Sequence, residues 1–175
     1  GLGYYSRATN LLKAAKIIKK KYKSKIPKNY IDLINLPGIG DYTAKAILGI
    51  AYNQPVMPID ANINRILARL YGLEQPLNKI KNDLIKKSAN YISKNFSSNL
   101  IQAFMDYGSI ICLPRNPNCK ICLIRDKCLS YQNNKQNMIP VKNKLKSHKT
   151  KKYSRAYIFS NEKNEILIRK RSSKG

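Results

Sequence analysis

Acidic residues are scarce in this chain of 175 residues: nine Asp and Glu stand against 34 Lys and Arg, which leaves a formal net charge of +25. A chain this short of negative charge attracts polyanions, so nucleic acid is the first partner that the composition suggests. The chain is also rich in Asn and Ile, a composition that an AT-rich genome can produce without any selection for binding. Charge alone therefore favours nucleic acid without establishing it.

Long apolar runs are missing as well. No stretch of the sequence reaches the length of a membrane-spanning helix, so we expect no membrane contact. The chain begins at Gly1 rather than at Met and ends at Gly175 inside a charged run, and we expect a fragment of a longer protein. The lack of a signal peptide then says little about the compartment.

Apolar residues at helical spacing predict a mainly helical first part. The predicted helices cover residues 7–22, 30–35, 41–52, 63–71, 79–95 and 99–111. Residues 132–152 are polar and rich in Lys, which is typical of a linker. Residues 156–160 and 166–169 then read as two short strands around a polar turn. The sequence predicts a helical domain over 1–131 and the truncated start of an α+β domain over 153–175.

Cysteine is absent outside one short segment, where the pattern C-x6-C-x2-C-x5-C gives Cys112, Cys119, Cys122 and Cys128. Four thiolates this close together can surround one metal centre, and both tetrahedral zinc and an iron–sulfur cluster accept four Cys. Two disulfides are a third reading, less favoured because the chain is helical, Lys-rich and long enough for a hydrophobic core. The spacing by itself leaves zinc and iron–sulfur open.

A Gly-rich turn, Leu36-Pro37-Gly38-Ile39-Gly40, lies between two predicted short helices. Its glycines allow a tight turn, and the amides that follow point outward at the next helix N-terminus, where they can bind an anion. An ordinary helix–helix turn can also contain Gly-x-Gly. The full order of short helix, L-P-G-I-G and amphipathic helix is the signature of the helix-hairpin-helix, which grips a DNA phosphate without reading sequence.

Two further motifs stand before predicted helices. Asp60 lies in Pro58-Ile59-Asp60-Ala61-Asn62, where the residue pattern taken alone favours a helix N-cap. Gly1-Leu2-Gly3-Tyr4-Tyr5 can place an aromatic ring at a tip, or its tyrosines can pack in the core.

In chain order the four motifs are G-L-G-Y-Y, L-P-G-I-G, P-I-D-A-N and C-x6-C-x2-C-x5-C. Together they resemble the helix-hairpin-helix DNA glycosylases that carry an iron–sulfur cluster, and most closely their adenine-specific, MutY-type branch. The resemblance covers residues 1–130 and extends to 156–170, which are similar to the start of a Nudix-like C-terminal domain. It implies a [4Fe-4S] cluster on the four cysteines. It also implies that a nucleotide is flipped out of duplex DNA and that adenine mispaired with 8-oxoguanine or guanine is removed by hydrolysis of its N-glycosidic bond.

The resemblance also implies roles for single residues. Asp60 matches the catalytic carboxylate that stabilises the developing sugar cation, and Asn62 orients that site. The implied DNA contacts are the wedge residue Tyr4 and the hairpin residues Leu36, Gly38 and Gly40. The implied setting is a monomer at the nucleoid of a bacterial cytoplasm.

Tyr42 distinguishes two branches of this family. At its position the related endonuclease III has a lysine that attacks the sugar and supports strand cleavage. A phenol is not a Schiff-base nucleophile, so we expect a monofunctional glycosylase and not a glycosylase/lyase for oxidised pyrimidines.

Three departures from the family pattern bear on activity. Ala61 stands where the family usually has Gly. The family's general acid, a Glu in an N-terminal helix, has no counterpart in this sequence, and neither does most of the C-terminal domain. We therefore expect the chain as it stands to be poorly active or inactive. A non-catalytic DNA-binding module with structural zinc is the remaining alternative, and it gives no reason for the Asp60 motif.

Overall fold

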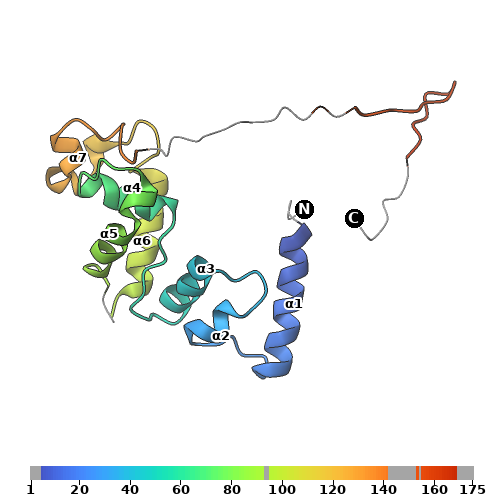
Figure 1. The fold of residues 1–175 in the computed structure, drawn as a ribbon, viewed down its shortest axis with the longest axis horizontal. Helices are drawn as coiled ribbons and strands as arrows, with labels where there is room; N and C mark the ends of the chain where they lie inside the picture. The colour runs from blue at the N-terminus through green and yellow to red at the C-terminus, as the bar shows by residue number, and fades with distance from the viewer. Residues whose placement is uncertain (1–4, 93–94, 142–152, 154, 169–175) are drawn as a thin grey trace. The chain divides into compact units, whose positions relative to one another are not determined.

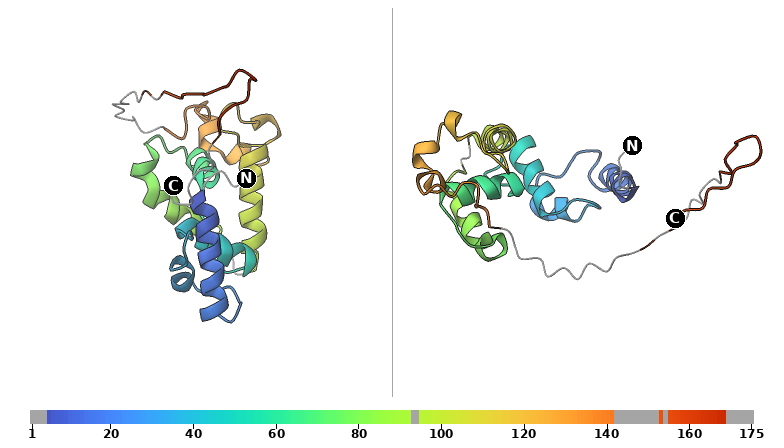
Figure 2. Two further views of the ribbon diagram at one scale, coloured as in Figure 1. Left: turned by 90° about the vertical axis from the view of Figure 1, so that its right-hand side faces the viewer. Right: turned by 90° about the horizontal axis from the view of Figure 1, so that it is seen from above.

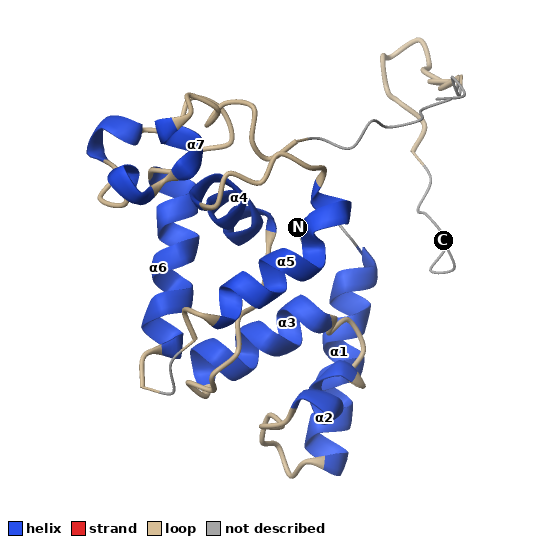
Figure 3. Cartoon of the chain, turned by 60° about the vertical axis from the view of Figure 1, so that its left-hand side comes forward, coloured by secondary structure: helices blue, strands red, loops and turns tan. Residues whose placement is uncertain are grey.

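The computed structural model describes residues 5–92, 95–141, 153 and 155–168 (Figure 1). Backbone contacts divide the chain into two units, Gly1–Asn143 and Lys144–Gly175, which we describe separately. Every helix of the described residues lies in the first unit, and no strand is drawn there (Figure 3).

The first six α-helices of the first unit follow the predicted order, and the seventh, at Leu129–Gln132, was not predicted. They are α1 (Tyr5–Lys21), α2 (Tyr30–Ile34), α3 (Asp41–Ala46) with the π-helical turn Ile47–Ala51, α4 (Ala61–Leu70), α5 (Leu77–Ala89), α6 (Ser97–Ile110) and α7 (Leu129–Gln132), with 3-10 turns at Cys119–Ile121 and Arg125–Lys127. The mainly helical prediction is confirmed. The largest difference is α5, which ends at Ala89 with Asn90 as its C-cap instead of continuing to residue 95.

None of the helices in the described ranges combines the length and the apolarity that crossing a bilayer requires.

Two hydrophobic clusters hold the first unit together. The first joins α1, α2 and α3 through Ala14, Leu33, Leu36, Ala44 and Leu48. The second surrounds α4, which lies between α5 and α6 (Figures 2 and 3), and consists of Met57, Ile63, Leu67, Ala68, Ile80, Leu84, Ile101 and Ile139. Burying a side chain such as Leu67 contributes about 1.5–3 kcal/mol, so the apolar stripe of α4 fixes the position of this helix.

The first unit extends into the segment that was predicted to be a linker. Ile139 is buried in the second cluster, and its carbonyl accepts a hydrogen bond of 2.8 Å from Nε of Arg69. Pro76 and Val141 form an isolated parallel bridge. Residues 132–141 are therefore packed, and residues 142–152 lie outside the described residues. The polar composition of residues 132–141 did not indicate this packing, because backbone atoms as well as the side chain of Ile139 make the contacts.

The described part of the second unit is a short turn without strands. Ser160 and Ile166 form one antiparallel bridge, and the amide of Leu167 donates to the carbonyl of Phe159 at 2.9 Å. Within residues 155–168 the predicted pair of strands is therefore wrong, although the polar turn between them is present. Its apolar side chains, such as Ile158, are exposed, and a lone two-stranded hairpin has little stability in water. The Nudix-like character of this part stays a prediction.

Candidate active site and metal centre

The Gly-rich turn connects α2 to α3 as the hairpin prediction requires. Gly38 has φ of +80°, a conformation that favours glycine, and a Cβ built there would lie 2.9 Å from Cβ of Asn10 in α1. Gly40 is the N-cap of α3, with φ of −97° and nothing within 4 Å of a Cβ built on it. The fold therefore requires glycine at position 38 and has room for a larger residue at position 40.

Leu36 holds this turn against the hydrophobic cluster of α1, α2 and α3. Its side chain is 3% exposed and packs in the cluster of α1, α2 and α3. The side chain therefore cannot reach DNA, and any contact made by Leu36 would have to come from its backbone.

Tyr42 lies within electrostatic reach of Asp60, although 17 residues separate them in the chain. Asp60 is the N-cap of α4, and its Oδ1 accepts a hydrogen bond of 2.7 Å from the amide of Ile63. Burial, and then the negative charge of Asp60, raise the pKa of Tyr42. The pair thus consists of a half-buried carboxylate held by a helix terminus and a phenol that stays neutral at ordinary pH.

Asn62 is held by a buried arginine that sequence reasoning missed. Arg65 is 6% exposed, and its Nη2 donates to Oδ1 of Asn62 at 2.8 Å and to the carbonyl of Gly108 at 2.7 Å. Its Nε donates to the carbonyl of Cys112 at 2.8 Å. Burial lowers the pKa of Arg65, but a guanidinium remains charged. This residue links the Asp60–Asn62 motif to the first cysteine.

Gly108 lets α6 come this close to α4. A Cβ built on it would lie 2.7 Å from Cβ of Asn62 and 3.1 Å from its Cγ. A side chain at position 108 would therefore displace Asn62 or separate the two helices.

A second buried arginine, one turn further along α4, holds the cysteine loop. Arg69 is 2% exposed and donates to the carbonyls of Leu113 at 2.6 Å and Pro114 at 3.1 Å. Its Nη1 also lies 3.4 Å from Sγ of Cys112. One sequence signal marks both arginines: they lie four residues apart among the apolar residues of α4.

The four cysteines are free thiols and line one pocket. Apolar side chains form most of the rest of its wall, with Ile66, Leu70, Ile111, Pro117 and Ile124 among them. The hydroxyl of Tyr107, in α6, donates to Sγ of Cys122 at 2.9 Å. Burial and this hydrogen bond raise the pKa of Tyr107 to about 12, so the phenol keeps its proton. The structure gives no support to the disulfide reading.

The separation of the four thiols bears on which metal centre they could hold. A tetrahedral zinc holds four sulfurs at about 2.3 Å, which places them about 3.8 Å from one another. In the described part of the chain, no group of three or more Cys, His, Asp or Glu side chains could hold one metal ion. An iron–sulfur cluster binds each thiolate through a different iron, so its ligands stand farther apart around one cavity. Burial raises the pKa of Cys119 and Cys128, and a bound metal would offset that effect.

Tyr4 lies outside the described residues. Its neighbour Tyr5, the first residue of α1, is 86% exposed, so this tyrosine does not pack in the core.

Comparison with known proteins decides the family. The model of the HhH-GPD superfamily of base excision DNA repair proteins matches residues 1–91, just over half of the chain. The chain belongs to this superfamily. The resemblance to the helix-hairpin-helix DNA glycosylases is thereby confirmed, and the HhH-GPD match covers the hairpin, Asp60, Asn62 and both buried arginines.

The relatives of this HhH-GPD protein include an adenine DNA glycosylase and an endonuclease III. It is 40% identical over 176 residues to an adenine DNA glycosylase of Buchnera aphidicola subsp. Baizongia pistaciae, covering 100% of this chain and 50% of that protein. It is 31% identical over 128 residues to an endonuclease III of the same organism, covering 73% of this chain and 58% of that protein. The chain thus spans about half the length of the curated relatives that it matches.

Among solved structures, the HhH-GPD fold is shared with a thermostable thymine-DNA glycosylase. The TM-score is 0.65 at 26% identity, and the match covers 72% of this chain and 58% of that one.

Proposed function

We propose that the protein to which this chain belongs removes adenine mispaired with 8-oxoguanine or guanine from duplex DNA, by hydrolysis and without strand cleavage. The observation that carries this proposal is that Asp60 caps α4 within electrostatic reach of Tyr42, a phenol at the position where the lyase branch has a lysine. The 40% identity to a relative named adenine DNA glycosylase supports the choice of base.

In this proposal Asp60 stabilises the positive charge that develops on the sugar as the glycosidic bond breaks. Its Oδ1 is fixed by the amide of Ile63, while Oδ2 makes no hydrogen bond within the described residues and stays available to the substrate. Arg65 fixes Asn62 through Oδ1 of Asn62, while the amide nitrogen of Asn62 makes no hydrogen bond within the described residues and can position the site.

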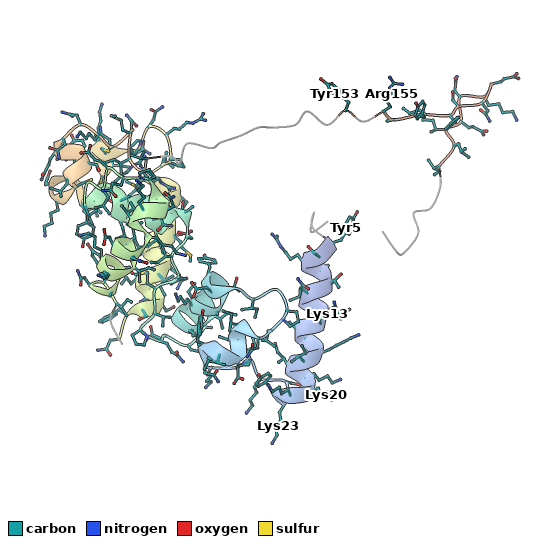
Figure 4. The ribbon with its side chains drawn as sticks, in the orientation of Figure 1. Tyr5, Lys13, Lys20, Lys23, Tyr153 and Arg155 are labelled. Carbon is teal, nitrogen blue, oxygen red and sulfur yellow. The ribbon has the colours of Figure 1, made fainter. Side chains whose placement is uncertain are left out.

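DNA is the proposed partner of the hairpin. In this proposal the amides at the start of α3 hold a backbone phosphate, which would give no sequence preference. The lysines of α1 add long-range attraction: Lys13 and Lys20, with Lys23 just beyond the helix, are exposed and extend from the ribbon (Figure 4).

The two hairpin glycines should respond differently to the same substitution. Gly38→Ala should lower the free energy of unfolding by about 1–2 kcal/mol, because φ of +80° is unfavourable for alanine. Gly40→Ala should leave the stability nearly unchanged and weaken duplex binding for all sequences alike, because its added methyl group faces open space where the phosphate is proposed to lie. Urea unfolding and fluorescence anisotropy at several salt concentrations measure both effects. Normal DNA binding by Gly40→Ala would remove the hairpin from the proposal.

Tyr42 predicts the absence of lyase activity. A full-length protein should leave intact abasic sites, with strand breaks appearing only after alkali, since the phenol at position 42 cannot form a Schiff base with the sugar. Gel analysis with and without alkali checks this. Borohydride trapping of a covalent protein–DNA complex that disappears when Lys45 is replaced would instead support an endonuclease III-like lyase.

The substrate proposal has a direct test. Full-length protein should release adenine from duplexes with 8-oxoguanine:A and G:A, and should leave duplexes with oxidised pyrimidines unchanged. The reverse preference would favour the endonuclease III branch, to which the 31% identity also extends. Duplex binding without release of any base would favour the non-catalytic module.

A [4Fe-4S] cluster is part of the proposal. Cys112, Cys119, Cys122 and Cys128 would hold it, and it would supply a rigid cross-link of the loop together with a one-electron redox couple. Arg69 binds the carbonyls of this loop and Arg65 that of Cys112, so the cluster would also keep the loop in register with α4.

A further inference from the structure

The cysteine pocket contains a hydroxyl that the proposed glycosylase chemistry does not use. Tyr107 lies in α6, about one turn before Cys112, and its ring forms part of the wall on which the four thiols lie. Its hydroxyl is directed at Sγ of Cys122 at 2.9 Å. The other side-chain donor to a sulfur in the described residues is Arg69, 3.4 Å from Cys112.

We infer that Tyr107 is a hydrogen-bond donor to the cluster ligand Cys122 and sets the reduction potential of the centre. This inference rests on the cluster of the proposed function. A hydrogen bond to a ligand sulfur stabilises the state with more negative charge, which is the reduced state, and so raises the potential.

The surroundings of Tyr107 strengthen this effect. The wall of the pocket is mostly apolar, and a donor that reaches a sulfur there meets little competition from water. The helical backbone of α6 also fixes the phenol more firmly than a loop residue would be fixed. Arg69 is a less suitable residue for testing the reduction potential, because it also donates to three backbone carbonyls and its replacement would disturb the loop.

Tyr131 provides a matched control. It lines the same pocket, and the centroid of its ring lies 5.8 Å from Cζ of Arg125 in a cation–π contact. Within the described residues its hydroxyl donates to no cysteine. Replacing either tyrosine by phenylalanine removes one hydroxyl and keeps the ring. A change specific to Tyr107→Phe therefore reports the hydrogen bond and not the packing.

The experiment is protein-film voltammetry on full-length, iron-loaded protein without DNA. Tyr107→Phe should have a more negative midpoint potential than the parent at the same iron content, and Tyr131→Phe should match the parent. The Fe–S(Cys) bands in resonance Raman spectra should lose part of their shift in deuterium oxide only in Tyr107→Phe. Replacing Tyr107 with 3-fluorotyrosine, a stronger donor of nearly the same size, should move the potential in the positive direction.

Different results would contradict the role of Tyr107 and the presence of the cluster. Tyr107→Phe with full iron and the parent's potential would overturn the inference and leave the glycosylase proposal intact. If Tyr107→Phe holds no iron, an unchanged potential in the fluorotyrosine protein overturns the inference. Protein that contains zinc and no iron would overturn the proposed cluster together with the role of Tyr107 in it.

Discussion

Asp60→Asn should slow adenine excision by the full-length protein by a factor of about one hundred or more, while stability and DNA binding stay near those of the parent. The structure shows that Asp60 caps α4 through the amide of Ile63. Asn is about as good an N-cap as Asp, so this substitution retains the helix start and removes the negative charge. A pure capping role would leave both stability and activity close to normal.

Single-turnover excision under saturating enzyme measures the chemical step without product release. Asp83→Asn, the same substitution at an exposed position of α5, is the matched control and should behave as the parent. Asp60→Ala completes the set, because it removes both the cap and the charge and should also lower stability by about 1 kcal/mol. An Asp60→Asn protein within a few-fold of the parent rate would leave Asp60 as a cap only.

The helical part of the fold was predictable because it depends on local periodicity. The stripe of α4 at Ile63, Ile66 and Leu67 has the spacing of one helix face, and the structure buries all three side chains. The hairpin followed from its two glycines, although only Gly38 has the backbone conformation that glycine alone favours. The positive φ of Gly38 depends on the geometry of the turn, and the sequence alone does not show which of the two glycines adopts it.

The contacts that connect the site to the cysteine loop were not predictable. Arg65 binds the carbonyl of Cys112, which lies 47 residues away, and Arg69 binds that of Ile139, 70 residues away. Such partners arise from tertiary packing, and backbone carbonyls carry no sequence signal. Gly108 was missed for the same reason, since its role is to admit Asn62 from another helix.

The second unit shows where strand-like composition misleads. Residues 156–160 and 166–168 have the composition of strands, yet they form a single bridge in the described structure. Strand propensity reports how well a residue fits a half-buried sheet, and the apolar side chains there, Tyr157 and Ile168 among them, are exposed.

Cys122→Ser should remove most of the iron from the full-length protein and sharply reduce its soluble yield. The parent, prepared without oxygen, should contain iron and sulfide and absorb broadly in the visible range. Metal binding and folding are coupled in such sites, because ligands that are dispersed in the unfolded chain are held together only when the metal is bound. Elemental analysis, absorption spectra and thermal unfolding measure these results.

The effect of Cys122→Ser should spread beyond the loop. Without the cluster, Cys112 loses one of the constraints that hold its carbonyl against Arg65, and Arg65 in turn positions Asn62. Stripping iron from the parent with a chelator should therefore lower both its melting temperature and its excision rate, while the same chelator should have little further effect on Cys122→Ser. Stoichiometric zinc without iron in the parent, or an iron-free protein with unchanged melting and excision, would contradict the assignment of a cluster that supports the site.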